Sequence, residues 1–112
     1  MTGKQLYMRI EMPDGSKWDV PAKIIAEERA KYFAAHNSGK DSGAEFDKIY
    51  NEELELAMNN KEEDYYEIRD WVSNNMNWED LVSVAQKVEN PPKRGVDYDE
   101  GVMNGDKTFL MK

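Results

Sequence analysis

Apolar and polar residues alternate from Leu6 to Val20. In the first part of this segment the apolar side chains fall on every second residue, at Leu6, Met8, Ile10 and Met12. This alternation predicts a half-buried β-strand. Residues 13–16 read Pro-Asp-Gly-Ser, a turn in which proline presets φ and glycine accepts a positive φ. Trp18 and Val20 then continue the alternation. The pattern predicts a β-hairpin, which needs helices or a further strand to be stable.

Helical spacing of apolar residues replaces the alternation after Val20. It predicts four helices, over residues 21–36, 43–59, 61–73 and 78–89. Ser42 and Glu45 match a capping box at the start of the second helix, and Asn77 is a cap for the fourth. The fourth helix has the most regular apolar stripe in the chain: Trp78, Leu81, Val84, Ala85 and Val88. Asn-Pro-Pro at residues 90–92 ends it.

The last residues of the chain show no clear period. Residues 91–112 contain proline and three glycines, and we expect them to form a tail after a compact domain of residues 1–90. Residues 107–111 are either a short third strand beside the hairpin or part of a tail that orders on a partner. The predicted fold class is α+β, with an N-terminal β-hairpin, joined or not by the C-terminal strand, packed on three or four α-helices.

Composition narrows the class of protein. The 112 residues suit one domain. The chain contains no cysteine, which excludes disulfides, thiolate metal sites and cysteine nucleophiles. No apolar run approaches the roughly 20 residues that cross a bilayer, and the first residues lack the apolar core of a signal peptide. We therefore expect a cytoplasmic protein that does not bind membranes.

Negative charge is concentrated in the middle of the chain. The formal net charge is −8; residues 41–80 hold 13 acidic and three basic side chains, a balance of −10, and the other residues carry +2. Such a chain should repel nucleic acid. Acidic helix faces commonly serve only to keep a protein in solution. This segment nevertheless supplies the candidate partner-binding residues, which are Glu52, Glu53, Glu55, Glu62, Glu63, Asp64, Tyr66 and Glu67.

Sequence motifs of catalysis are absent. The chain has no GxGxxG, GxxxxGK[ST] or GxSxG pattern. A calcium loop starting at Asp97 would need glycine at its sixth position, where Val102 stands. His36, the single histidine, lies near the predicted end of a helix, where an imidazolium favours the dipole. We expect no enzyme, no cofactor and no metal; the enzymatic alternative is a pocket that holds a carboxylate with a raised pKa.

Aromatic residues are expected mainly in the core. Stacking on nucleic-acid bases needs accompanying positive charge, which residues 62–80 lack. Tyr66 and Tyr98 lie outside the apolar stripes, so both are expected at the surface, where they are candidates for a protein interface.

Two segments resemble small acidic proteins encoded by tailed bacteriophages and prophages. They are residues 12–26, Met-Pro-Asp-Gly-Ser-Lys-Trp-Asp-Val-Pro-Ala-Lys-Ile-Ile-Ala, and residues 71–81, Trp-Val-Ser-Asn-Asn-Met-Asn-Trp-Glu-Asp-Leu. The two segments contain no catalytic motif, so the resemblance transfers no functional residue. It implies a phage or prophage origin and action in the host cytoplasm. Small acidic phage proteins include inhibitors of host defence and of host nucleic-acid enzymes, so it also favours an interaction function.

The functional hypothesis from the sequence is a non-enzymatic interaction protein that binds a host or phage protein through its acidic helical face. In one version the carboxylates mimic DNA phosphates and occupy the surface that a nucleic-acid-binding protein uses for its ligand. The alternative is a structural or accessory phage protein that self-associates.

Overall fold

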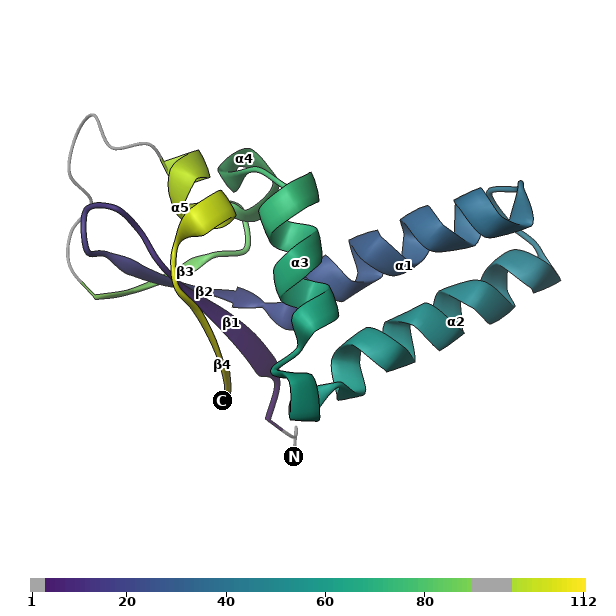
Figure 1. Cartoon of the computed structure of the whole chain (residues 1–112), viewed down its shortest axis with the longest axis horizontal. Helices are drawn as coiled ribbons and strands as arrows, with labels where there is room; N and C mark the ends of the chain where they lie inside the picture. Colours follow the sequence, from purple (N-terminus) through teal and green to yellow (C-terminus); the bar gives the residue numbers. More distant parts are fainter. Residues whose placement is uncertain (1–3, 90–97) are drawn as a thin grey trace.

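The computed structural model describes residues 4–89 and 98–112 (Figure 1). Along the chain the elements are β1 (Leu6–Glu11), β2 (Lys17–Pro21), α1 (Ala22–Ser38), α2 (Ala44–Asn59), the 3-10 helix η1 (Lys61–Glu63), α3 (Tyr66–Asn75), α4 (Trp78–Leu81), β3 (Gln86–Glu89), α5 (Tyr98–Asn104) and β4 (Lys107–Met111). This arrangement confirms the predicted α+β class.

The strands form one antiparallel sheet in the order β3-β2-β1-β4. Met8 of β1 lies opposite Val20 of β2 on one side and opposite Phe109 of β4 on the other. The hairpin turn is closed by the Met12 N–H, which donates to the Ser16 carbonyl at 2.8 Å. Gly15 has a φ of +83°, the conformation for which the turn needs glycine. The predicted hairpin is confirmed, and of the two expectations for residues 107–111 the strand is confirmed.

One face of the sheet carries the core. Alternate side chains of β1 are fully buried there, and helices α1 and α3 supply the opposing apolar side chains. Burial of this face against helices is what stabilises a hairpin that would be marginal by itself. The largest fully buried apolar residues are Met8, Ile10, Val20, Ile25, Ile68, Val72, Leu81 and Val102.

Helices α1 and α2 form an antiparallel hairpin that projects from the sheet (Figure 1). Alanines at every fourth position of α1 are fully buried, at Ala22, Ala26, Ala30 and Ala34. Side chains four residues apart share a helix face, and small ones allow two helices to approach closely. Ala57 is the buried residue of α2, whereas its other apolar side chains are half-buried or exposed. The far end of the hairpin is therefore a two-helix layer.

The fourth predicted helix is wrong beyond its first turn. Helix α4 ends at Leu81, and residues 86–89 form β3 beside β2. Asn77 does cap α4, in a capping box with Asp80. Val84 and Val88 fit a helical stripe by spacing, but Val84 lies in the turn after α4, where its N–H donates to the Leu81 carbonyl, and Val88 lies in β3, where pairing with β2 satisfies the backbone.

Two further boundaries differ from the prediction. Helix α2 starts at Ala44 with Gly43 as its N-cap, and no side chain caps it, so the capping box proposed for Ser42 and Glu45 is wrong. After Asn60 the chain forms the short η1, and α3 begins only at Tyr66. Residues 90–97, which include the Asn-Pro-Pro helix stop and Asp97 of the calcium pattern, lie outside the described residues.

Helix α5 was not predicted. Two glycines, Gly101 and Gly105, allow it to pack closely on the end of β1. A Cβ at Gly101 would collide with the Met12 sulfur, and one at Gly105 would collide with the carbonyl oxygens of Glu11 and Gly101. The backbone of α5 thus lies directly on the end of β1, where only glycine fits.

We expect Gly105→Ala to destabilise the fold by about 1–3 kcal/mol, because the colliding atoms belong to the backbone and cannot swing aside. Urea denaturation measures the effect. Gly39→Asn is the control: Gly39 has a φ of +71° with open space around it, and asparagine tolerates that conformation. Equal losses for the two variants would show that the close approach of α5 is unimportant.

Candidate functional site

The outward side of α2 carries an exposed row of carboxylates. Glu45, Glu52 and Glu55 are all exposed, and their spacing places them on the helix face opposite Ala57, which is buried against the core. In the described part of the chain, the carboxylates of Glu52 and Glu55 have neither a hydrogen-bond nor an ion-pair partner. Lys48 is exposed on the same face, one turn before Glu52, so the row keeps a net negative charge that this lysine offsets in part.

A shallow hollow of about 430 Å³ lies at the end of this row. It is lined by Glu52, Glu55, Leu56, Asn59 and Asn60. Leu56 is 50% exposed within it. An exposed leucine between two carboxylates combines an apolar contact with negative charge. We call this surface, defined by Glu45, Glu52, Glu55 and Leu56, the α2 acidic face.

Three of the candidate partner-binding residues are engaged inside the molecule instead. Glu53 accepts a hydrogen bond from Arg29 Nη1 of α1 at 2.9 Å. Both carboxylate oxygens of Glu67 accept from Asn60 Nδ2, at 2.6 and 2.9 Å. Asp64 forms an ion pair with Arg69 at 3.6 Å. Glu53 and Glu67 hold helices and turns together, so they are poor choices for binding a partner.

The link between α2 and α3 presents further acidic residues. Glu62 and Glu63 of η1 are exposed. Asp64 and Tyr65 follow with φ values of +53° and +54°, a conformation that is uncommon for residues other than glycine. Arg69 Nε donates to the Asp64 carbonyl at 2.9 Å and its Nη2 donates to the Glu63 carbonyl at 3.2 Å. One arginine therefore supports this strained turn.

Tyr66 and Tyr98, both expected at the surface, differ in their exposure to solvent. Tyr66 is 51% exposed, and the Arg69 guanidinium lies 5.8 Å from its ring centroid. Tyr98 is half-buried, so that expectation is wrong for it. Its hydroxyl donates to Asp14 Oδ2 at 2.7 Å and lies 3.0 Å from Ser16 Oγ. Burial, which is the main cause, raises the pKa of Tyr98, and Asp14 raises it further.

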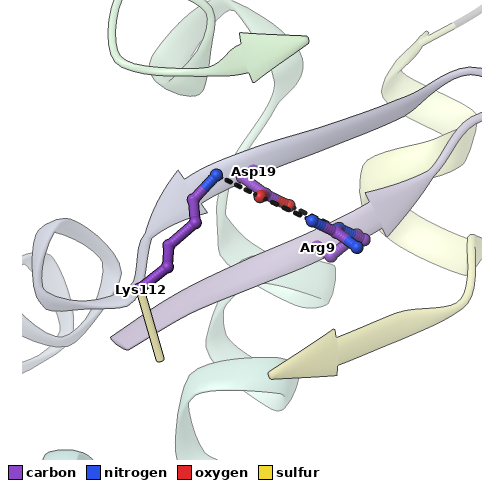
Figure 2. A network of polar contacts seen from close by, with 3 residues as sticks. All are labelled: Arg9, Asp19 and Lys112. Carbon is purple, nitrogen blue, oxygen red and sulfur yellow. Dashed lines mark hydrogen bonds and ion pairs between the residues drawn. The ribbon is translucent and has the colours of Figure 1, made fainter. Parts of the chain in front are cut away.

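Asp19 is a fully buried charged residue in the described part of the chain. Its side chain is fully buried, with 0% exposure, on the sheet face opposite the apolar core. Arg9 binds both carboxylate oxygens, through Nε at 2.8 Å and Nη2 at 3.0 Å. Lys112 Nζ donates to Oδ2 at 2.7 Å. Figure 2 shows the carboxylate held between the two cations.

The surroundings of Asp19 keep it ionised. Burial by itself would raise its pKa, but hydrogen bonds and charge from Arg9 and Lys112 outweigh burial and lower the pKa below 3.8. A carboxylate held in this way remains an anion and does not act as a general acid at neutral pH. We interpret the Arg9–Asp19–Lys112 network as a structural clamp.

Reasoning from the sequence missed this clamp. A turn at residues 13–16 places Arg9 opposite Asp19 in the hairpin, so that pair was accessible from the strand register. Lys112 comes from 93 positions further along the chain, and no local pattern indicates it.

No group of three or more His, Asp or Glu side chains in residues 4–89 and 98–112 is arranged to hold a metal ion. His36 is exposed in the last turn of α1 and stacks on Tyr32, with ring centroids 5.8 Å apart. None of the helices in the described part is long and apolar enough to cross a membrane.

Comparison of the chain with models of protein families, with curated proteins and with solved structures found no match.

We expect Asp19→Asn to destabilise the fold by about 2–4 kcal/mol near neutral pH, because the variant leaves two partly buried cations uncompensated. The pKa of Asp19 is lowered in the fold, so its contribution is complete above an unfolded-state pKa of about 3.9. That contribution is lost as the pH falls through the folded-state pKa. The stability difference between wild type and variant should therefore shrink in acid.

Urea denaturation across this pH range measures both effects, and Glu52→Gln, which changes an exposed carboxylate, is the control. A loss for Asp19→Asn that is independent of pH would show that packing, rather than the ionised carboxylate, stabilises the sheet.

Proposed function

We propose that this protein is a non-enzymatic interaction module that binds a basic surface of a partner protein through the α2 acidic face. The observation that carries the proposal is the half-exposed Leu56 in a hollow beside the exposed carboxylates of Glu52 and Glu55. Glu62 and Glu63 extend the negative surface after α2. The proposal omits Glu53 and Glu67, because their carboxylates are engaged within the fold.

The chemistry of the hollow selects its occupant. Lysine and arginine have an apolar stem and a charged head, so the stem suits Leu56 while the head reaches Glu52 or Glu55. Each exposed ion pair contributes only about 0.2–1 kcal/mol, so binding needs several pairs together. A partner with clustered Lys and Arg side chains meets this condition.

Nucleic-acid-binding proteins are the class of partner that we propose first. Their phosphate-binding surfaces are rich in Lys and Arg, and an acidic protein can occupy such a surface in place of the phosphates. On α2, Glu52 and Glu55 stand one turn apart, which separates their backbones by about 4.5 Å along the helix. We propose a bacterial host target, which a phage origin of this chain would imply, and inhibition by steric blocking.

The projecting hairpin suits this role. Helices α1 and α2 extend away from the sheet, so the outer side of α2 is accessible without rearrangement (Figure 1). A basic partner would also be drawn to the segment that holds the charge of −10.

The test is a pull-down from bacterial lysate with tagged wild type, an α2 variant and a charge-matched control. We expect Glu52→Lys with Glu55→Lys to reduce recovery of the partner at least tenfold and high salt to reduce recovery by the wild type. The control, Glu28→Lys with Glu79→Lys, changes the net charge equally at exposed positions outside the α2 acidic face and should retain the partner.

Leu56→Ser tests the apolar part of the same surface and should also weaken recovery. Equal recovery by the α2 variant and the wild type would refute the proposal. Equal loss with the control variant would mean that overall charge, rather than this face, attracts basic proteins.

A further inference from the structure

A second surface of this molecule is the outer edge of β4. Strand β4 is the last in the order β3-β2-β1-β4, and no strand of the described residues lies beyond it. Gln5 and Lys112 exchange both backbone hydrogen bonds, at 3.0 and 2.9 Å, and Glu11 N–H donates to Asp106. In an antiparallel pair such residues alternate with residues that face away. The N–H and C=O groups of Lys107, Phe109 and Met111 therefore point outward from the sheet.

This edge has few of the features that prevent strand pairing. It contains no proline and pairs with β1 without a bulge. Lys107 is the charged residue among the outward-facing positions, and its ammonium folds back to donate to the Gly105 carbonyl at 3.0 Å. Met111, at the other end, is 52% exposed.

The edge is complementary to itself. Antiparallel pairing over the whole of β4 with a second copy places Phe109 opposite Phe109 of that copy. Each Lys107 then lies opposite a Met111, and each Thr108 opposite a Leu110, so no like charges meet. Just outside the strand, Asp106 of each copy faces Lys112 of the other, so no like charges meet there although the Lys112 ammonium is bound by Asp19 of its own copy.

The distribution of charge over the whole chain also permits this contact. Residues 41–80 carry −10, whereas the remainder, to which β4 belongs, carries +2. Two copies that pair through β4 therefore do not need to bring their acidic segments into the contact.

We infer that the occupant of this edge is a second copy of this chain, paired antiparallel through β4 about a twofold axis at Phe109. The two sheets then join into one continuous sheet. Pairing of two short strands buries a small area, so the dimer forms and dissociates with concentration. This inference does not depend on the α2 acidic face.

Sedimentation equilibrium of the wild type tests the inference. The average mass should rise from 13.0 kDa toward twice that value as concentration increases. Met111→Pro removes an outward N–H that β1 does not use, so the fold is retained while dimerisation weakens about tenfold or more. Met111→Ala keeps the N–H and is the control. A wild type that remains monomeric at every concentration would overturn the inference.

Disulfide trapping tests the register, and the absence of native cysteine gives a clean background. Thr108 and Leu110 form directly opposed pairs in the proposed register, with Cα atoms about 4.5 Å apart, which is within disulfide reach. A mixture of the Thr108→Cys and Leu110→Cys proteins should therefore give a mixed covalent dimer under mild oxidation. Preferential linkage of either variant to itself would place the strands in another register and contradict the axis at Phe109. Failure of mixed and self linkage alike would contradict the interface.

Discussion

A carboxylate without solvent contact must find its counter-charges inside the protein. This requirement determines how strands from the two ends of the chain join in one sheet. Removing an ion from water costs several kcal/mol. For an unpaired ion this cost would exceed what one side chain contributes to stability. Asp19 meets the requirement with Arg9 from the neighbouring strand and Lys112 from the far end of the chain. Strands β2 and β4 are thus held in one sheet, with β1 between them. The opposite face of that sheet then remains free for the apolar core.

The division between what sequence patterns predicted and what they missed follows the range of the interactions. The β-hairpin was predictable because its signals, the alternation of apolar residues and the Pro-Asp-Gly-Ser turn, are local in the sequence. Helix α4 was predicted too long because Val84 and Val88 fit a helical spacing, while Val88 lies in a strand that pairs with β2, about 70 positions earlier. Similarly, the exposed positions of α2 followed from its period, but the engagement of Glu53 by Arg29 depended on how two helices meet.

The same distinction applies to the candidate site. Charge counting located the acidic segment. The structure shows that some of its carboxylates are exposed, whereas others accept hydrogen bonds within the fold. Glu52 and Glu55 belong to the first group, whereas Glu67, which accepts from Asn60, belongs to the second. Leu56 falls outside the apolar period of α2 and among its outward glutamates, so spacing predicts its exposure, whereas the hollow around it had no signal in the sequence. Its exposure results from the two-helix thickness of the hairpin, which leaves α2 with no third layer to cover its outer side.

The placement of the three tryptophans gives this molecule two separate optical reporters. Trp18 and Trp78 contact each other with ring centroids 5.2 Å apart, and both contact Tyr98 of α5. Trp71 lies elsewhere, against Tyr32 of α1 at 5.3 Å. Indole emission responds to local polarity, so the first pair registers the seating of α5 on the sheet and Trp71 registers the seating of the projecting hairpin on α3. Fluorescence of single-tryptophan variants can thus distinguish loosening of the hairpin from opening of the sheet within the same chain.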